Sequence, residues 1–201
     1  MARKPHPGNF LDIGCSEGFY VQAAKSLGWD AFGVEVAGKR VEHAKSRGLN
    51  IFSFEEYSEK LDFFDFVLVR HVIEHVPEFL EVIKSALRQT KDGGVVCIET
   101  PNQKGLITLT KRHKLLGDRF LGHLYPPTHI HAFEPKTYLK IAKKLNVKSL
   151  LVTTYSPADS EWFFISNYHE SYYKKFIHKL ITYFGMGENI CAIYLKNNEK
   201  T

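Results

Sequence analysis

The segment that most constrains the fold lies near the start of the chain, where an apolar run passes directly into a glycine-rich turn. It reads Phe10-Leu11-Asp12-Ile13-Gly14-Cys15-Ser16-Glu17-Gly18. A short apolar run bounded by glycines predicts a buried strand, and helical spacing begins at Phe19. Gly14 permits a tight turn with close backbone approach, and Gly18 permits the helix to pack closely on the strand. Strand, turn and helix in this order are typical of a nucleotide-cofactor loop.

An acidic residue follows about twenty residues after this loop, at the end of a second apolar run, Phe32-Gly33-Val34-Glu35. An acid at this distance can accept hydrogen bonds from both ribose hydroxyls. A nicotinamide-binding enzyme shares this logic, so a dinucleotide-dependent oxidoreductase is one alternative. Against it, the spacing Gly14-x-Ser16-x-Gly18 is tighter than G-x-G-x-x-G, and Asp12 stands two residues before the first glycine.

The rest of the chain alternates between strand and helix patterns. Helical spacing of apolar residues predicts helices over 19–27, 39–47, 77–89 and 134–145. Apolar runs predict strands over 31–36, 49–52, 63–69, 95–99, 148–154 and 189–196, and the turn Asp92-Gly93-Gly94 leads into the fourth of these. Strands separated by helices predict an α/β fold with a parallel sheet.

These motifs together resemble those of class I S-adenosylmethionine (SAM) methyltransferases. Besides the loop, the resemblance rests on Gly33-Val34-Glu35, Phe64-Asp65-Phe66-Val67, Glu74-His75-Val76, Asp92-Gly93-Gly94 and Thr100-Pro101-Asn102, in that order. The chain is most similar to the small-molecule branch, which includes ubiquinone-biosynthesis O-methyltransferases and methyltransferases associated with polysaccharide synthesis. The resemblance runs from about Asn9 to Thr154, and it implies a Rossmann-like sandwich whose mostly parallel seven-stranded sheet has an antiparallel last strand.

Ligands of such sheets bind at the carboxyl ends of the strands, and this rule collects the candidate cofactor residues. They are Asp12, Gly14, Cys15, Ser16 and Gly18 after the first strand, Glu35 and Val36 after the second, Phe54 and Glu55 after the third, and Arg70 with His71 after the fourth. The resemblance implies that the loop backbone cradles the methionine part of SAM, that Glu35 holds the ribose and that Phe54 and Glu55 flank adenine.

The sequence departs from the family pattern in two places. Ser16 stands where the family loop has its middle glycine, and its small side chain is expected to be tolerated. Family members also carry helices before the first strand that close over the cofactor, whereas about eight residues precede it here. The insertion at about 103–133 is expected to form the acceptor side or a lid. Because so few residues precede the first strand, a catalytically inactive SAM-binding module is a second alternative.

Four histidines, in two motifs, are candidates for other chemistry. His71-Val72-Ile73-Glu74-His75 matches the H-x-x-E-H pattern of some zinc proteases, but it leaves a strand and Pro77 follows it, so no metal is expected. Glu74 and His75 can equally organise the loop after the strand. Two histidines alternate in His129-Ile130-His131 and project to one side of an extended segment. They could form a metal-binding pair, act as an acid or base, or be ordinary polar residues of a loop.

The segment Pro126-Pro127-Thr128-His129-Ile130-His131-Ala132-Phe133 resembles the P-x-H-x-x-x-F segment of the polysaccharide-associated branch, where family enzymes receive the acceptor. That resemblance makes His129 the first candidate for a catalytic residue, with His71 the second. A hydroxyl acceptor must lose its proton, and a histidine titrates near neutral pH. The histidines therefore favour O-methylation of a small molecule or glycan, with SAM converted to S-adenosylhomocysteine.

Composition and charge limit the number of domains, the cellular compartment and the partners that are expected. A chain of 201 residues without a linker or repeat is expected to form one methyltransferase domain over 1–201. Three separated cysteines, no leader pattern and no long apolar span favour a reducing cytoplasm. The formal charge is −3 over residues 1–100 and +8 over 101–201. The basic half is compatible with solvated lysines, an anionic acceptor, a membrane surface, a protein partner or a homodimer, and it gives no firm sign of nucleic acid.

Overall fold

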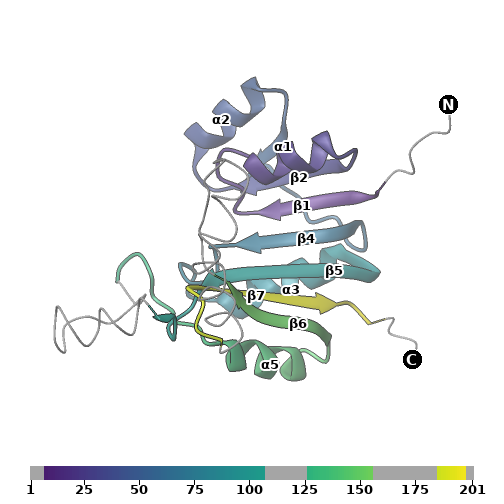
Figure 1. The fold of residues 1–201 in the computed structure, drawn as a ribbon. Coiled ribbons are helices and arrows are strands. Elements are labelled where there is room, and N and C mark those ends of the chain that lie inside the picture. Colours follow the sequence, from purple (N-terminus) through teal and green to yellow (C-terminus); the bar gives the residue numbers. More distant parts are fainter. Residues whose placement is uncertain (1–6, 107–125, 156–184, 198–201) are drawn as a thin grey trace, which may run out of the picture. The chain divides into compact units, whose positions relative to one another are not determined.

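The computed structural model describes residues 7–106, 126–155 and 185–197, in which strands and helices alternate (Figure 1). The elements are β1 (Asn9–Ile13), α1 (Phe19–Ser26), β2 (Asp30–Glu35), α2 (Gly38–Ser46), β3 (Asn50–Ser53), β4 (Phe64–Arg70), α3 (Phe79–Gln89), β5 (Thr90–Pro101), α5 (Pro135–Lys144), β6 (Lys148–Tyr155) and β7 (Asn189–Leu195). Each predicted element is present, and all but one lie within two residues of the predicted bounds.

The exception is β5, which begins five residues before the predicted strand and includes the Asp92-Gly93-Gly94 turn. The reason is backbone pairing that the sequence pattern does not show. The Gly93 N–H donates to the Lys196 carbonyl at 3.0 Å, and the Lys196 N–H donates to the Gly94 carbonyl at 3.0 Å. Gly93 has φ +75°, so the strand passes through a left-handed residue that glycine accommodates.

The seven strands form a sheet of order β3-β2-β1-β4-β5-β7-β6. β1 pairs in parallel with β2 and with β4, and β2 pairs in parallel with β3. The register places Ile13, the last residue of β1, beside Val34 and Val69. The carboxyl ends of β1, β2 and β4 therefore meet at one edge of the sheet. The prediction of a mostly parallel α/β sheet with an antiparallel last strand is confirmed.

Two compact units can be distinguished. The first contains residues 1–72, 80–97 and 194–201, and the second contains 73–79 and 98–193. In the first unit Phe10 stacks on Phe66 with ring centroids 5.7 Å apart, and Trp29 packs edge-on against both. In the second, Tyr138 is buried and its hydroxyl lies 2.6 Å from that of Thr100. The interpretation of the chain as a single methyltransferase domain stays a prediction.

A glycine inside β2 lets the first helix and the loop approach the sheet. A Cβ atom on Gly33 would lie 2.6 Å from the Cys15 sulfur and 2.9 Å from a Val21 methyl group, both closer than real contacts allow. α1 presents Val21 and Ala24 to the core, and it begins after Gly18, whose φ is +81°. The glycine in Gly33-Val34-Glu35 thus has a packing role beside the cofactor loop.

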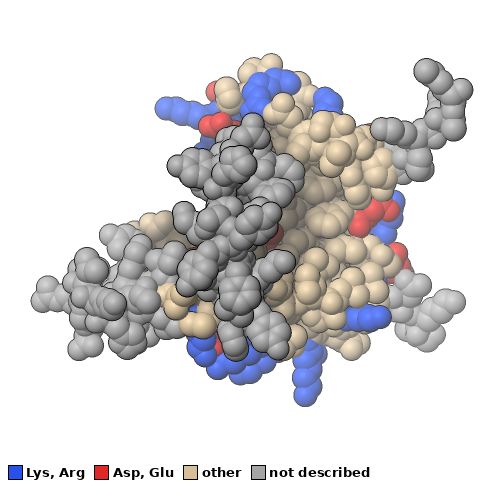
Figure 2. Space-filling model, viewed as in Figure 1, with Lys and Arg blue, Asp and Glu red and all other residues tan. Residues whose placement is uncertain are grey.

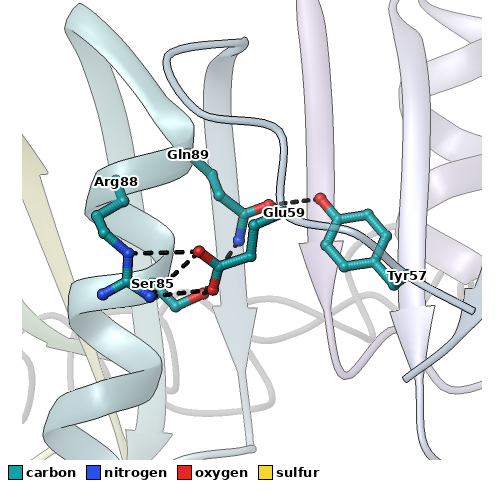
Figure 3. A network of polar contacts seen from close by, with 5 residues as sticks. All are labelled: Tyr57, Glu59, Ser85, Arg88 and Gln89. Atoms are coloured by element: carbon teal, nitrogen blue, oxygen red, sulfur yellow. Dashed lines mark hydrogen bonds and ion pairs between the residues drawn. The ribbon is translucent and has the colours of Figure 1, made fainter. Parts of the chain in front are cut away.

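The connection between β3 and β4 is held by a polar network on α3 (Figure 3). The Tyr57 hydroxyl donates to the Gln89 side chain, whose amide donates to Ser85 Oγ at 3.1 Å. Ser85 Oγ donates to Glu59 at 2.6 Å, and Arg88 Nη2 donates to both oxygens of the same carboxylate at 3.0 and 3.1 Å. Burial, with the nearby charge of Glu59, raises the pKa of Tyr57 to about 12. The network fixes the loop that follows Phe54 and Glu55.

On the face seen in Figure 2, lysine and arginine side chains gather over α2 and over α5. α5 alone contributes Lys136, Lys140, Lys143 and Lys144. In residues 7–106, 126–155 and 185–197, no helix has both the length and the apolar character needed to cross a membrane.

Candidate functional site

The glycine-rich loop after β1 is anchored to the end of β2. The N–H groups of Gly14 and Cys15 both donate to the Val34 carbonyl, at 2.8 and 3.0 Å, and the Gly18 N–H donates to the Cys15 carbonyl at 2.9 Å. Gly14 and Ser16 have φ +77° and +51°. Two left-handed residues in three reverse the chain tightly enough for α1 to begin at Phe19.

The Glu35 carboxylate holds the middle of this loop. Its Oε2 accepts the Ser16 N–H at 2.8 Å, and its Oε1 accepts the Ala37 N–H at 2.9 Å. The residue is 6% exposed. Hydrogen bonds from backbone N–H groups to an ionised carboxylate are stronger than those between two neutral groups. They fix both the Glu35 side chain and the glycine-rich loop. Glu35 therefore has a structural task that the sequence alone did not reveal, in addition to its expected place at the end of β2.

The remaining acceptor capacity of Glu35 suits a diol. An ionised carboxylate has about four lone-pair positions, and the two backbone N–H groups use two of them. Two positions remain for two adjacent hydroxyl donors. This donor and acceptor balance fits the ribose of a nucleoside cofactor.

Apolar side chains are exposed beside this carboxylate. Val36 follows β2 and is 74% exposed, while Phe54 follows β3 and is 66% exposed. The Phe54 N–H donates to the Glu35 carbonyl at 3.2 Å, which joins the ends of the two strands. Glu55 is exposed next to Phe54. Exposed apolar residues next to a carboxylate can contact a base while the carboxylate binds the sugar.

The two loop glycines adopt left-handed conformations, as a tight turn requires, and both also pack closely against side chains. A Cβ on Gly14 would lie 2.3 Å from the Val72 Cγ2 atom, and one on Gly18 would lie 2.5 Å from Ile51 Cδ1 and 2.8 Å from Leu49 Cδ1. Both glycines are therefore required by left-handed φ values and by close side-chain packing in the protein itself. Gly18 thus also allows close contact with residues at the start of β3.

Asp12, Cys15 and Arg70 complete the cofactor residues that the sequence predicted. Asp12 is buried in β1, and Cys15 is buried in the loop. Burial, with the negative charges of Asp12 and Glu35, raises the pKa of the Cys15 thiol, which therefore stays protonated at neutral pH. Arg70 ends β4 with its guanidinium 5.3 Å from the centroid of the Tyr20 ring.

His71 follows Arg70 directly and is half-buried. Its φ is +52°, a left-handed value that is uncommon for a histidine and that turns the chain sharply at the end of β4. His71 belongs to the first unit and His129 to the second.

In the second unit the structure brings Glu74, His75 and His129 together. One ligand atom of each lies within 4.8 Å of the others, a spacing at which the three could hold a metal ion. His75 Nε2 lies 4.0 Å from Glu74 Oε1, and the rings of His75 and His129 meet edge to face with centroids 4.7 Å apart. The sequence places Glu74 beside His75, but no motif joins His129 to them, because the contact spans more than fifty positions of the chain.

We expect that neither folding nor cofactor binding needs this metal site. Structural zinc sites use four protein ligands, whereas the cluster offers three, and one ring nitrogen of His75 is already bound to the Thr128 carbonyl at 2.7 Å. Elemental analysis of protein purified without an affinity tag should therefore show no stoichiometric metal. Stoichiometric zinc in the wild type that disappears in a His75→Ala, His129→Ala double variant would overturn this expectation.

Asn102, the last residue of the Thr100-Pro101-Asn102 motif, has a structural role in the second unit. Its side-chain amide donates to the carbonyls of Gly185 and Gly187 at 3.2 and 2.6 Å, and its Oδ1 accepts the Lys104 N–H at 3.0 Å. Because the side chain is buried, these bonds fix the chain where it leaves β5. Of the insertion at about 103–133, residues 107–125 lie outside the described part of the chain.

The fold and the loop define a class of protein, the class I methyltransferase with a Rossmann-like sheet. A methyltransferase domain family matches residues 1–151, and the chain belongs to this family. Among relatives, it is 26% identical over 167 residues to a protein named ubiquinone biosynthesis O-methyltransferase from Rickettsia conorii, with 76% of this chain covered. The chain spans 56% of that relative's length.

Solved structures agree on the fold. A SAM-dependent methyltransferase from Thermotoga maritima, described as a possible histamine N-methyltransferase, is similar with a TM-score of 0.63 at 19% identity, over 94% of this chain and 82% of that one. A Haemonchus contortus phosphoethanolamine N-methyltransferase in complex with SAM has a TM-score of 0.64 at 19% identity, over 95% of this chain and 49% of that one. Both likenesses support the expected sheet.

Proposed function

We propose that the protein is a SAM-dependent methyltransferase that transfers a methyl group to a hydroxyl of a small molecule or glycan. The observation that carries the proposal is the Glu35 carboxylate, held between the Ser16 and Ala37 N–H groups with acceptor capacity left for a ribose. Membership of a methyltransferase family favours methyl transfer over hydride transfer to NAD. The name of the Rickettsia conorii relative supports oxygen as the acceptor atom.

The cofactor residues are assigned from their positions at the carboxyl ends of the strands. Glu35 binds the ribose hydroxyls, the backbone from Asp12 to Gly18 with Cys15 and Ser16 borders the methionine part, and Val36, Phe54 and Glu55 border adenine. Arg70, at the end of β4, is the last of the proposed cofactor residues. The solved Haemonchus contortus complex with SAM, which shares the fold, supports the choice of cofactor.

Bound SAM supplies a methyl group on a positively charged sulfur, an electrophile that an oxygen nucleophile attacks in line. The residues of this chain align the two partners, which contributes about 7–11 kcal/mol in favourable cases. As the oxygen–carbon bond forms and the carbon–sulfur bond breaks, the acceptor loses its hydroxyl proton. His129 accepts that proton in this proposal, with His71 as the second candidate.

Glu35→Ala should weaken SAM binding by about 1–3 kcal/mol, because charge-assisted hydrogen bonds to the ribose and to the Ser16 N–H are lost together. Glu35→Gln keeps one acceptor oxygen and should bind with intermediate affinity. Glu42→Ala, which removes an exposed carboxylate from α2, is the matched control and should bind as the wild type does. Isothermal calorimetry measures all four proteins, and wild-type affinity in Glu35→Ala would remove Glu35 from the site.

The reaction is tested by single-turnover transfer of a labelled methyl group from SAM to phenolic, aliphatic and sugar hydroxyls. Formation of a labelled ether together with one equivalent of S-adenosylhomocysteine supports the proposed O-methylation. Transfer to amines alone would replace oxygen with nitrogen as the acceptor atom. SAM binding without transfer to any class of acceptor, in a protein shown to be folded, would favour the inactive SAM-binding module.

A further inference from the structure

Two histidines connect the loop after β4 to the segment that carries His129, and they do so reciprocally. His75, on the loop, has its Nδ1 atom 2.7 Å from the Thr128 carbonyl of the segment. His131, on the segment, has its Nε2 atom 3.1 Å from the Pro77 carbonyl of the loop. The loop and the segment thus each contribute one imidazole and one carbonyl group. All four residues belong to the second unit.

The direction of these bonds fixes the proton positions. A carbonyl oxygen can only accept, so His75 must carry a proton on Nδ1 and His131 must carry one on Nε2. In the neutral state the two histidines are therefore opposite tautomers. Protonation of either ring keeps the N–H group that makes the bond, so both bonds persist when the ring is charged.

Backbone contacts reinforce the same junction. The N–H groups of Ile130 and His131 both donate to the Glu74 carbonyl, at 2.9 and 3.2 Å. The Phe79 ring packs edge-on against His131, with centroids 5.0 Å apart, and also against Phe133 at 5.4 Å. The segment is consequently held on both sides of His129.

We propose that His75 and His131 are positioning residues that lock the segment 128–133 onto the loop 74–79 and so set the place of His129. The histidine pair acts through its N–H to carbonyl bonds rather than as acid, base or ligand. The inference rests on the proposed function only for the role of His129, since the lock itself is a property of the folded chain. Two of the four histidines that the sequence offered for chemistry thereby have a structural explanation.

The tautomers give the first test, on the wild-type protein without any ligand. At pH 8, two-bond nitrogen–proton correlation spectra should show the proton of His75 on Nδ1 and that of His131 on Nε2. An Nε2–H tautomer at His75, or an Nδ1–H tautomer at His131, would contradict the proposed bonds. This measurement needs neither a variant nor an acceptor.

Hydrogen exchange gives the second test. The amides of Ile130 and His131 should exchange about tenfold faster in His75→Ala and in His131→Ala, because each variant removes one of the bonds that hold the segment. His75→Asn and His131→Gln place an amide N–H near the lost ring donor and should restore exchange to within about twofold of the wild type. Unchanged exchange in the His75→Ala, His131→Ala double variant would refute the lock.

Kinetics separates the lock from the proposed reaction once an acceptor is known. Both alanine variants should lower kcat with little change in the KM for SAM, and the Asn and Gln variants should recover it. If the exchange results hold while the wild type transfers no methyl group, the proposed function fails and the lock stands. If methyl transfer occurs and the alanine variants keep full kcat, the positioning role fails and the proposed function stands.

Discussion

Gly14→Val should abolish measurable SAM binding. The left-handed φ of +77° disfavours any β-branched residue, and the Cβ atom would lie 2.3 Å from Val72 Cγ2. The loop must therefore shift, which displaces the N–H groups of Gly14 and Cys15 from the Val34 carbonyl and the Ser16 N–H from Glu35. We expect an affinity loss of at least about 100-fold by calorimetry, equivalent to about 2.7 kcal/mol.

Gly48→Val is the matched control for this prediction. Gly48 also has a left-handed φ, +74°, but nothing lies within 4 Å of the Cβ position. The variant should lose stability through backbone strain alone and should bind SAM as the wild type does. Thermal unfolding of both variants shows whether each is folded, and a folded Gly14→Val protein with wild-type affinity would refute the assignment of this loop.

His129→Ala should lower turnover by about 100-fold or more while SAM affinity stays nearly unchanged. Removal of a general base raises the barrier of the step that deprotonates the acceptor and leaves the cofactor contacts in place. His129 is half-buried against the His75 ring, so the substitution also removes an edge-to-face contact. The prediction applies to an alcohol acceptor and is measured by single-turnover methyl transfer.

His43→Ala, which removes an exposed histidine from α2, should keep wild-type turnover and serves as its control. His71→Ala tests the second candidate. An equal loss in the His71 variant would indicate that the two histidines share the proton transfer. Full activity in a protein lacking both His71 and His129 would show that the site works by alignment alone.

The order and type of the elements could be predicted from the sequence because strands and helices differ in the period of their apolar residues. The run from Phe10 to Ile13 has one consistent interpretation as a strand. The helix over 19–27 could also be predicted, but its buried face is Val21 and Ala24, whereas Phe19 and Leu27, which helical spacing places on the apolar face, are exposed. The acidic residue at the end of β2 could also be predicted, because its position follows from the number of residues that separate it from the loop.

Local patterns could not supply contacts between distant residues. The Ser16 N–H to Glu35 bond spans nineteen positions, and the His75 to Thr128 bond spans fifty-three. A Cβ atom on Gly14 or Gly18 would meet Val72, Leu49 or Ile51, and no sequence pattern pairs these residues with the two glycines. These contacts depend on packing between elements, so the sequence named the residues of the candidate site without giving the reasons for their positions.

The assignment of a SAM site is tested most directly by competition calorimetry on the wild-type protein with SAM, S-adenosylhomocysteine and NAD. It predicts that SAM and S-adenosylhomocysteine bind at one shared site with micromolar affinity and that NAD, at millimolar concentration, displaces neither. Binding of NAD in place of SAM, or failure of the folded protein to bind SAM and S-adenosylhomocysteine, would contradict the assignment of the loop and Glu35 as a SAM site.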